Sequence, residues 1–116
     1  MLVPDVRETP WGFEDILWRS PAVTVKMLTI RRGERTSLQR HAKRDEHWTV
    51  LSEEGGTLEI GGVEREATPG YAAMVWRGST HRATAPDFAE LKILEVSHGE
   101  FNQDDIERIE DDYGRC

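Results

Sequence analysis

Histidine is the residue of this 116-residue chain best suited to bind a metal or to carry a proton, and it occurs at positions 41, 47, 81 and 98. Gln39 and His41 are two residues apart, so in a strand they project from the same face and could chelate one ion. The single cysteine is Cys116, at the last position. No thiolate cluster is therefore available, and any metal must be bound through nitrogen and oxygen.

The other candidates stand at the beginnings and ends of strand-like runs. Glu46 opens the alternating run EHWTVL and shares a face with Trp48, whereas His47 lies on the other face. His81 follows the tight turn expected at the preceding Gly-Ser pair, and His98 follows the end of a strand. We expect His98 to be solvated and His47 to lie on the surface or to contact a site only from outside.

Short apolar runs closed by glycine dominate the rest of the pattern, and such runs at spacings of about 8 to 12 residues are typical of an antiparallel sandwich or small barrel. Two adjacent glycines, Gly61 and Gly62, predict a β-hairpin turn. The only helical pattern is DDIERIED, with Asn102 or Asp104 as its N-cap. We expect strands over residues 23–30, 46–51, 57–60, 63–66, 71–76 and 88–96 and a short helix over 104–111.

Length and charge limit the remaining possibilities. A chain of 116 residues is expected to form one domain, residues 1–116, with no room for a second catalytic domain. The net charge of −7 argues against a nucleic-acid partner. No run of about 18 apolar residues and no signal-peptide pattern is present, so we expect a soluble, cytoplasmic protein that does not enter a membrane.

Two spaced motifs carry a family resemblance. The first is Gly33, five residues, Gln39, one residue, His41, four residues and Glu46. The second begins at Gly70 and ends in Trp-Arg-Gly-Ser-Thr-His at His81. Together they resemble the paired metal motifs of the cupin superfamily, which are all-β jelly-roll barrels, here with a short C-terminal helix or extended tail.

The similarity is closest to the cupin domain of type II mannose-6-phosphate isomerases, usually the C-terminal part of bifunctional mannose-1-phosphate guanylyltransferases. It extends to Pro-Trp-Gly near the start, to Arg-Asp-Glu-His-Trp and to the acidic tail that ends in Tyr-Gly-Arg. The resemblance implies that one divalent metal is bound by Gln39, His41, Glu46 and His81. This mixed donor set suits Zn²⁺ first, and Mn²⁺, Fe²⁺, Co²⁺ or Ni²⁺ are acceptable.

The resemblance also implies interconversion of mannose 6-phosphate and fructose 6-phosphate through an enediol, with a sugar phosphate as the small-molecule partner. Arg44 and Arg82 are the expected substrate contacts, and Arg82 is also a candidate for a catalytic role. Lys43, which stands where the family commonly has histidine, is either the general base or a strand-end lysine in water. Trp48 either contacts the sugar or, like Trp76, forms part of the core or pocket wall.

Two other functions remain open from the residues. The chain could be a non-catalytic cupin that binds a sugar or a sugar phosphate. Alternatively, His41, Glu46 and His81 could form a two-histidine, one-carboxylate site for Fe²⁺ and oxygen chemistry. A homodimer is compatible with such a barrel, but no residue pattern demonstrates one.

Overall fold

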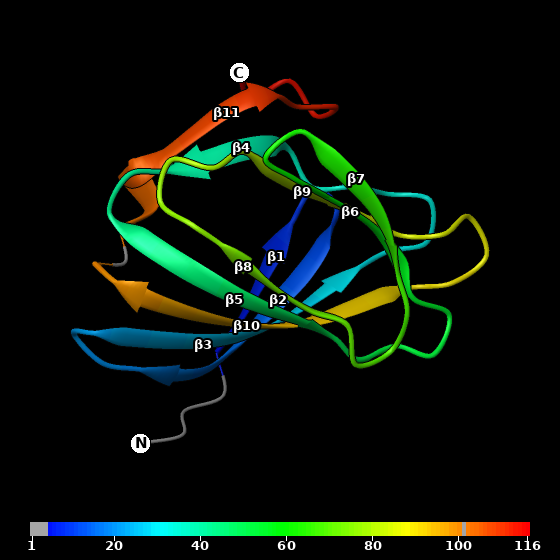
Figure 1. Cartoon of the computed structure of the whole chain (residues 1–116), viewed down its shortest axis with the longest axis horizontal. Helices are drawn as coiled ribbons and strands as arrows, with labels where there is room; N and C mark the ends of the chain where they lie inside the picture. The colour runs from blue at the N-terminus through cyan, green and yellow to red at the C-terminus, as the bar shows by residue number, and fades with distance from the viewer. Residues whose placement is uncertain (1–4, 101) are drawn as a thin grey trace.

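Two antiparallel sheets face each other and form a barrel-like sandwich in the computed structural model, which describes residues 5–100 and 102–116 (Figure 1). One sheet has the strand order β1-β2-β3-β10-β5-β8 and the other has the order β11-β4-β9-β6-β7. The strands are β1 (Asp5–Thr9), β2 (Gly12–Arg19), β3 (Val23–Ile30), β4 (Leu38–His41), β5 (Arg44–Val50), β6 (Gly56–Ile60), β7 (Val63–Ala67), β8 (Ala72–Val75), β9 (His81–Thr84), β10 (Leu91–Gly99) and β11 (Ile106–Glu110).

The six predicted strands are confirmed, and so is the all-β class. The strand predicted over 23–30 has those bounds as β3, while the run predicted over 88–96 begins and ends three residues later as β10. The β6–β7 hairpin turns at Gly61 and Gly62, whose φ angles of 59° and 82° are those that a tight turn requires. Strands β1, β2 and β9 were not predicted.

The helix predicted over 104–111 is wrong, and the extended alternative is correct. Asn102 caps only a 3-10 turn, Gln103–Asp105, by accepting a hydrogen bond from the backbone of Asp104. The chain then continues as β11, which pairs with the otherwise open edge of β4. The carboxylate of Asp105 also accepts the backbone N–H groups of Ala42 and Lys43, so pairing with β4 outweighs the weak helical pattern.

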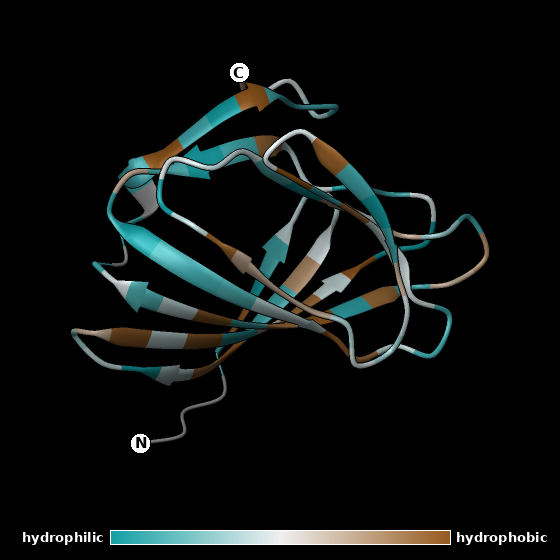
Figure 2. Ribbon diagram, viewed as in Figure 1, coloured by the Kyte–Doolittle hydropathy of each residue, from teal (hydrophilic) through white to brown (hydrophobic). Residues whose placement is uncertain are grey.

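The inward faces of the long strands change from apolar to polar along their length. On β10, Leu91 and Ile93 are followed on the same face by Glu95 and Ser97, all of them buried. Inward-facing residues of β5 and β3 change in the same way and in register with β10, so one end of the interior is apolar and the other polar. Along each ribbon, hydrophilic and hydrophobic residues are interspersed (Figure 2). The apolar core comprises Trp11, Leu28, Ile30, Trp48, Val50, Leu58, Ala67, Val75, Ala83, Ala85, Leu91 and Ile93.

No helix in the part of the chain that is described is long and apolar enough to cross a membrane.

Candidate metal centre

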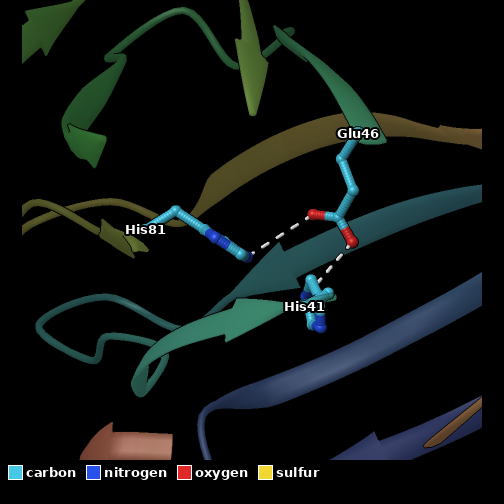
Figure 3. Close-up of side chains that lie close together, drawn as sticks. All are labelled: His41, Glu46 and His81. Carbon is cyan, nitrogen blue, oxygen red and sulfur yellow. Dashed lines mark ion pairs between the residues drawn. The ribbon is translucent and has the colours of Figure 1, made fainter. Parts of the chain in front are cut away.

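Three buried side chains converge at the polar end of the barrel, between the two sheets. His41 comes from β4, His81 from β9 and Glu46 from β5 of the facing sheet. In Figure 3 the carboxylate of Glu46 reaches both imidazoles: Oε2 lies 3.4 Å from His41 Nε2, and Oε1 lies 3.6 Å from His81 Nε2. One ligand atom from each of the three residues lies within 4.8 Å of the others.

The spacing and the chemistry of this cluster fit a divalent metal. Zinc bonds of about 2.0–2.2 Å in a tetrahedral site place neighbouring ligand atoms roughly 3.4 Å apart. The two histidine–carboxylate distances, 3.4 and 3.6 Å, match that spacing. Two imidazoles and a carboxylate are also donors that zinc, iron and manganese accept.

His81 is held in the form that a metal needs. Its Nδ1 lies 3.1 Å from the backbone carbonyl oxygen of Ser79, which can only accept a hydrogen bond, so Nδ1 carries the proton. The Nε2 lone pair therefore points to the centre, as in metal sites whose histidines are oriented through the other ring nitrogen. Burial lowers the pKa of His81, which keeps the ring neutral.

His41 is neutral for the same reason. Burial, followed by the positive charge of Arg44, lowers its pKa to about 2. Its Nδ1 is buried and has no hydrogen-bond partner among residues 5–100 and 102–116. No contact to Nδ1 therefore decides which ring nitrogen of His41 carries the proton. The nitrogen that faces Glu46 is Nε2.

Gln39 lies next to this cluster but presents its amide nitrogen to it. The residue is directly opposite His81 in the β4–β9 pairing, and its Nε2 lies 3.5 Å from His81 Nε2. Its Oε1 accepts a hydrogen bond of 2.7 Å from the hydroxyl of Ser37. For Gln39 to bind a metal through oxygen, as the family resemblance implies, its amide must turn over. The amide Nε2 would then donate to the Ser37 hydroxyl, which can accept as well as donate.

Arg44 places a guanidinium against two of the three cluster residues. Its Nε donates to Glu46 Oε2 at 3.0 Å, and its Nη2 lies 3.2 Å from His41 Nε2. The side chain is almost fully buried. This arginine, predicted as a substrate contact, therefore contacts the same lone pairs that a metal would use.

Trp48 and Glu95 complete the wall beside the cluster. The indole N–H of Trp48 lies 3.2 Å from both Glu46 Oε1 and Glu95 Oε1, and its ring meets that of His81 edge-on. Burial and the nearby charge of Glu46 raise the pKa of Glu95 to about 7. Sequence reasoning missed Glu95, although a glutamate on the inward face of a strand otherwise occupied by Leu91 and Ile93 is itself a signal.

Two predicted residues are not brought to the cluster. Arg82 follows His81 on β9 and so projects from the opposite face, where it donates to the Thr36 carbonyl and to the carboxylate of Glu110. Lys43 is more than half exposed in the turn between β4 and β5, 4.0 Å from Glu100. Arg82 is kept away from the cluster by strand alternation, and Lys43 is kept away by its place in the turn.

Of the remaining predictions for tryptophan and histidine side chains, some are confirmed and one is wrong. Trp48 forms part of the core and of the wall, as one of the two expectations had it, whereas Trp76 is 62% exposed and belongs to neither. His98 is exposed as expected, and His47 is half-buried on the outer face of β5.

A cavity of about 160 Å³ lies beside Glu46 and is lined by both polar and apolar residues. Gln39, Arg44, Glu46, Trp48 and Glu95 are among the residues that line it. Of the four predicted metal ligands, Gln39 and Glu46 line this cavity, whereas His41 and His81 lie behind that wall. A small polar ligand in the cavity could therefore contact Gln39, Glu46 and Glu95 at once.

The comparisons with known proteins agree with this architecture. The family described as Mannose-6-phosphate isomerase C-terminal matches residues 5–111. The chain belongs to this family. A mannose-1-phosphate guanylyltransferase of Klebsiella pneumoniae is 33% identical over 108 residues, which is 92% of this chain but 23% of that protein. The alginate biosynthesis protein AlgA of Pseudomonas aeruginosa is 38% identical over 109 residues, covering 91% of this chain and 22% of that protein.

Solved structures share the fold at lower identity. A cupin-2 domain protein of Rhodospirillum rubrum has a TM-score of 0.71 and 17% identity, covering 78% of this chain and 62% of that one. The capsular polysaccharide assembling protein CapF of Staphylococcus aureus has a TM-score of 0.79 and 14% identity, covering 93% of this chain and 34% of that one. The predicted cupin fold and family are thus confirmed. The chain spans less than a quarter of the length of the two curated relatives described above.

Proposed function

We propose that this domain is a metal-dependent sugar-phosphate isomerase that interconverts mannose 6-phosphate and fructose 6-phosphate. The observation that carries the proposal is the buried His41, Glu46 and His81 cluster beside a polar cavity, in a chain of the mannose-6-phosphate isomerase C-terminal family. We expect one divalent ion per chain, zinc by preference.

The chain's own residues would prepare the cavity for this chemistry. When bound, the metal would act as a Lewis acid that polarises the C1 and C2 oxygens of the sugar. Trp48 holds the carboxylate of Glu46 through its indole N–H, and Ser79 fixes the ring of His81. Both contacts are made before a ligand arrives, so the donors need little reorganisation.

Glu95 is our candidate for the group that moves the proton between C2 and C1. It lines the cavity beside Trp48, on the strand next to that of Glu46. Lys43, the earlier candidate, is exposed in a turn and is not among the residues around the cavity. A general base must lie within hydrogen-bond reach of the proton that it takes, and the cavity wall meets that requirement better than the turn.

The proposal is tested by a coupled assay of the full chain, prepared metal-free and then loaded with zinc. We expect fructose 6-phosphate to form from mannose 6-phosphate only in the loaded sample. Replacing Glu95→Gln keeps the shape of the wall and should lower kcat by about 100-fold or more with retained metal. Absence of turnover in a sample that carries one zinc per chain would refute the proposal.

The position of Arg44 favours a second candidate function, a domain that binds sugar phosphates without turnover. A guanidinium that hydrogen-bonds Glu46 and contacts His41 already supplies a cation to the cluster. In that case fructose 6-phosphate would raise the melting temperature of the metal-free chain, and added zinc would change neither binding nor conversion. Zinc-dependent turnover would reject this alternative.

A further inference from the structure

Three arginines line the cavity together with Glu8 and Glu14, and two of the three are partly exposed, which places them toward its mouth. The whole chain, in contrast, has a net charge of −7. Arg7 comes from β1, Arg108 from β11 and Arg115 from the segment that follows β11. Segments from the two ends of the sequence thus supply positive charge to one opening. Such a local concentration of guanidinium groups in an acidic protein favours an anionic ligand.

Arg108 differs from the other two arginines in its hydrogen bonding. Arg7 lies 3.7 Å from Glu14, and Arg115 forms a close pair with Asp111. The Nε of Arg108, in contrast, is buried and has no hydrogen-bond partner among residues 5–100 and 102–116. The hydroxyl of Thr9, which lines the same cavity, is buried and unpartnered in the same sense.

The strand pairing fixes where Arg108 lies relative to the metal centre. Arg108 is directly opposite Gln39 in the β11–β4 pairing, and Gln39 is directly opposite His81 in the β4–β9 pairing. Residues opposite one another share a face of the sheet, so all three project inward. Two strand spacings separate Arg108 from His81, about 10 Å across the sheet.

We infer that Arg108, flanked by Arg7 and Arg115, is the binding site for a phosphomonoester group at the mouth of the cavity. A planar guanidinium with a free Nε can donate two parallel hydrogen bonds to phosphate oxygens. With the phosphate there, the carbon chain of a hexose phosphate would extend inward toward Gln39 and Glu46, which line the same cavity. The choice of a sugar phosphate rests on the proposed function, whereas the phosphate site rests on these residues alone.

The test measures binding rather than turnover, on the full chain after removal of metal with a chelator. Calorimetric titrations use fructose 6-phosphate, fructose and inorganic phosphate against the wild type, Arg108→Gln and Arg108→Lys. Arg40→Gln is the matched control, because Arg40 lies on the adjacent strand, pairs with Glu107 outside the barrel and loses the same charge. Thermal melting of each variant verifies that it is folded.

We expect Arg108→Gln to weaken fructose 6-phosphate binding by about tenfold or more, because a charge-assisted bidentate contact is lost. Arg108→Lys should recover part of the affinity, and Arg40→Gln should stay within about twofold of the wild type. Competition by inorganic phosphate in the wild type, but not in Arg108→Gln, would support the same site. Tighter binding of the sugar phosphate than of inorganic phosphate would show that the sugar is held as well, and equal binding would identify free phosphate as the ligand.

Equal affinity of folded wild type and Arg108→Gln for fructose 6-phosphate would overturn the inference. That result is separable from failure of the isomerase proposal. If the chain shows zinc-dependent turnover but Arg108→Gln binds fructose 6-phosphate unchanged, the isomerase proposal stands and the phosphate site is rejected. If the chain shows no turnover but its sugar-phosphate binding depends on Arg108, the phosphate site stands and the isomerase proposal is rejected.

Discussion

The chemistry of this domain depends on a few polar side chains kept in defined states by burial. His41 and His81 are neutral because the interior disfavours their charged forms, and the Ser79 carbonyl decides which nitrogen of His81 faces the centre. Neutral imidazoles aimed at one carboxylate are what a metal needs. Substitutions of single residues therefore test the site most directly.

Replacing His81→Ala should weaken zinc binding by more than about 100-fold, because it removes a ligand and not only a supporting contact. His47→Ala is the matched control, since His47 lies on the outer face of the strand that carries Glu46. Chelator competition and metal analysis measure both affinities. Full zinc retention in His81→Ala, or equal loss in both variants, would contradict the assignment.

Arg44 should compete with a metal for Glu46 and His41. Replacing Arg44→Met leaves the buried carboxylate without this partner, so the metal-free variant should lose roughly 3 kcal/mol of unfolding free energy. Zinc should then raise its melting temperature more than that of the wild type. The control is Arg40→Met, because Arg40 and its partner Glu107 are exposed.

Denaturant unfolding with and without zinc measures these differences. If Arg44→Met and Arg40→Met gave the same zinc-induced shift, Arg44 would not compete for the centre.

At the scale of elements, the strands position the site by a simple rule. The inward faces of β3, β5 and β10 are polar or charged toward one end of each strand, and the register aligns these polar ends. The sequence predicted the strand β3 and the same-face placement of Gln39 and His41, since both depend only on alternation. It did not predict the pairing of β11 with β4, because that pairing depends on contacts between residues more than sixty positions apart.

The same limit explains the errors at the site. Arg82 was chosen because it follows His81 directly, but adjacent strand residues face opposite sides. Lys43 was chosen because it stands two residues after His41, but β4 ends at His41 and the alternation does not continue into the turn. Glu95 and Arg108 reach the cavity through the pairing of distant strands, which a single sequence does not display.

The segment after β11 is docked by Tyr113, whose hydroxyl donates to Glu34 and lies 3.0 Å from the Arg35 carbonyl. Tyr113→Phe should lower the free energy of unfolding by about 1 kcal/mol at neutral pH. Burial and Glu34 raise the pKa of Tyr113 from 10 to about 12. Because folding favours the protonated phenol, its contribution should be complete below pH 10 and be lost between pH 10 and 12.

Urea unfolding across this pH range measures that difference, with Tyr71→Phe as the control for loss of another tyrosine. A stability gap between wild type and Tyr113→Phe that stays constant from pH 10 to pH 12 would show that the phenol is not the titrating group.

At the scale of the molecule, the chain has a net charge of −7, and its buried charged residues include both acids and bases. A metal that binds only the folded chain adds to its stability, by about 2.7 kcal/mol at a concentration 100 times its Kd. For a domain of this size, zinc should therefore raise the melting temperature by roughly 10 °C, and a chelator should reverse the shift. A melting temperature that does not respond to zinc would argue against zinc binding to the folded chain.

Proton exchange during turnover tests the isomerase proposal most directly. Mannose 6-phosphate is incubated with the zinc-loaded chain in D₂O, and its C2 position and the appearance of fructose 6-phosphate are followed by NMR. An enediol route predicts that ketose forms and that deuterium enters the C–H position next to the carbonyl, with both processes strongly reduced in His81→Ala and in Glu95→Gln. If a chain carrying one zinc ion yields neither deuterium incorporation nor fructose 6-phosphate, this domain is not an isomerase.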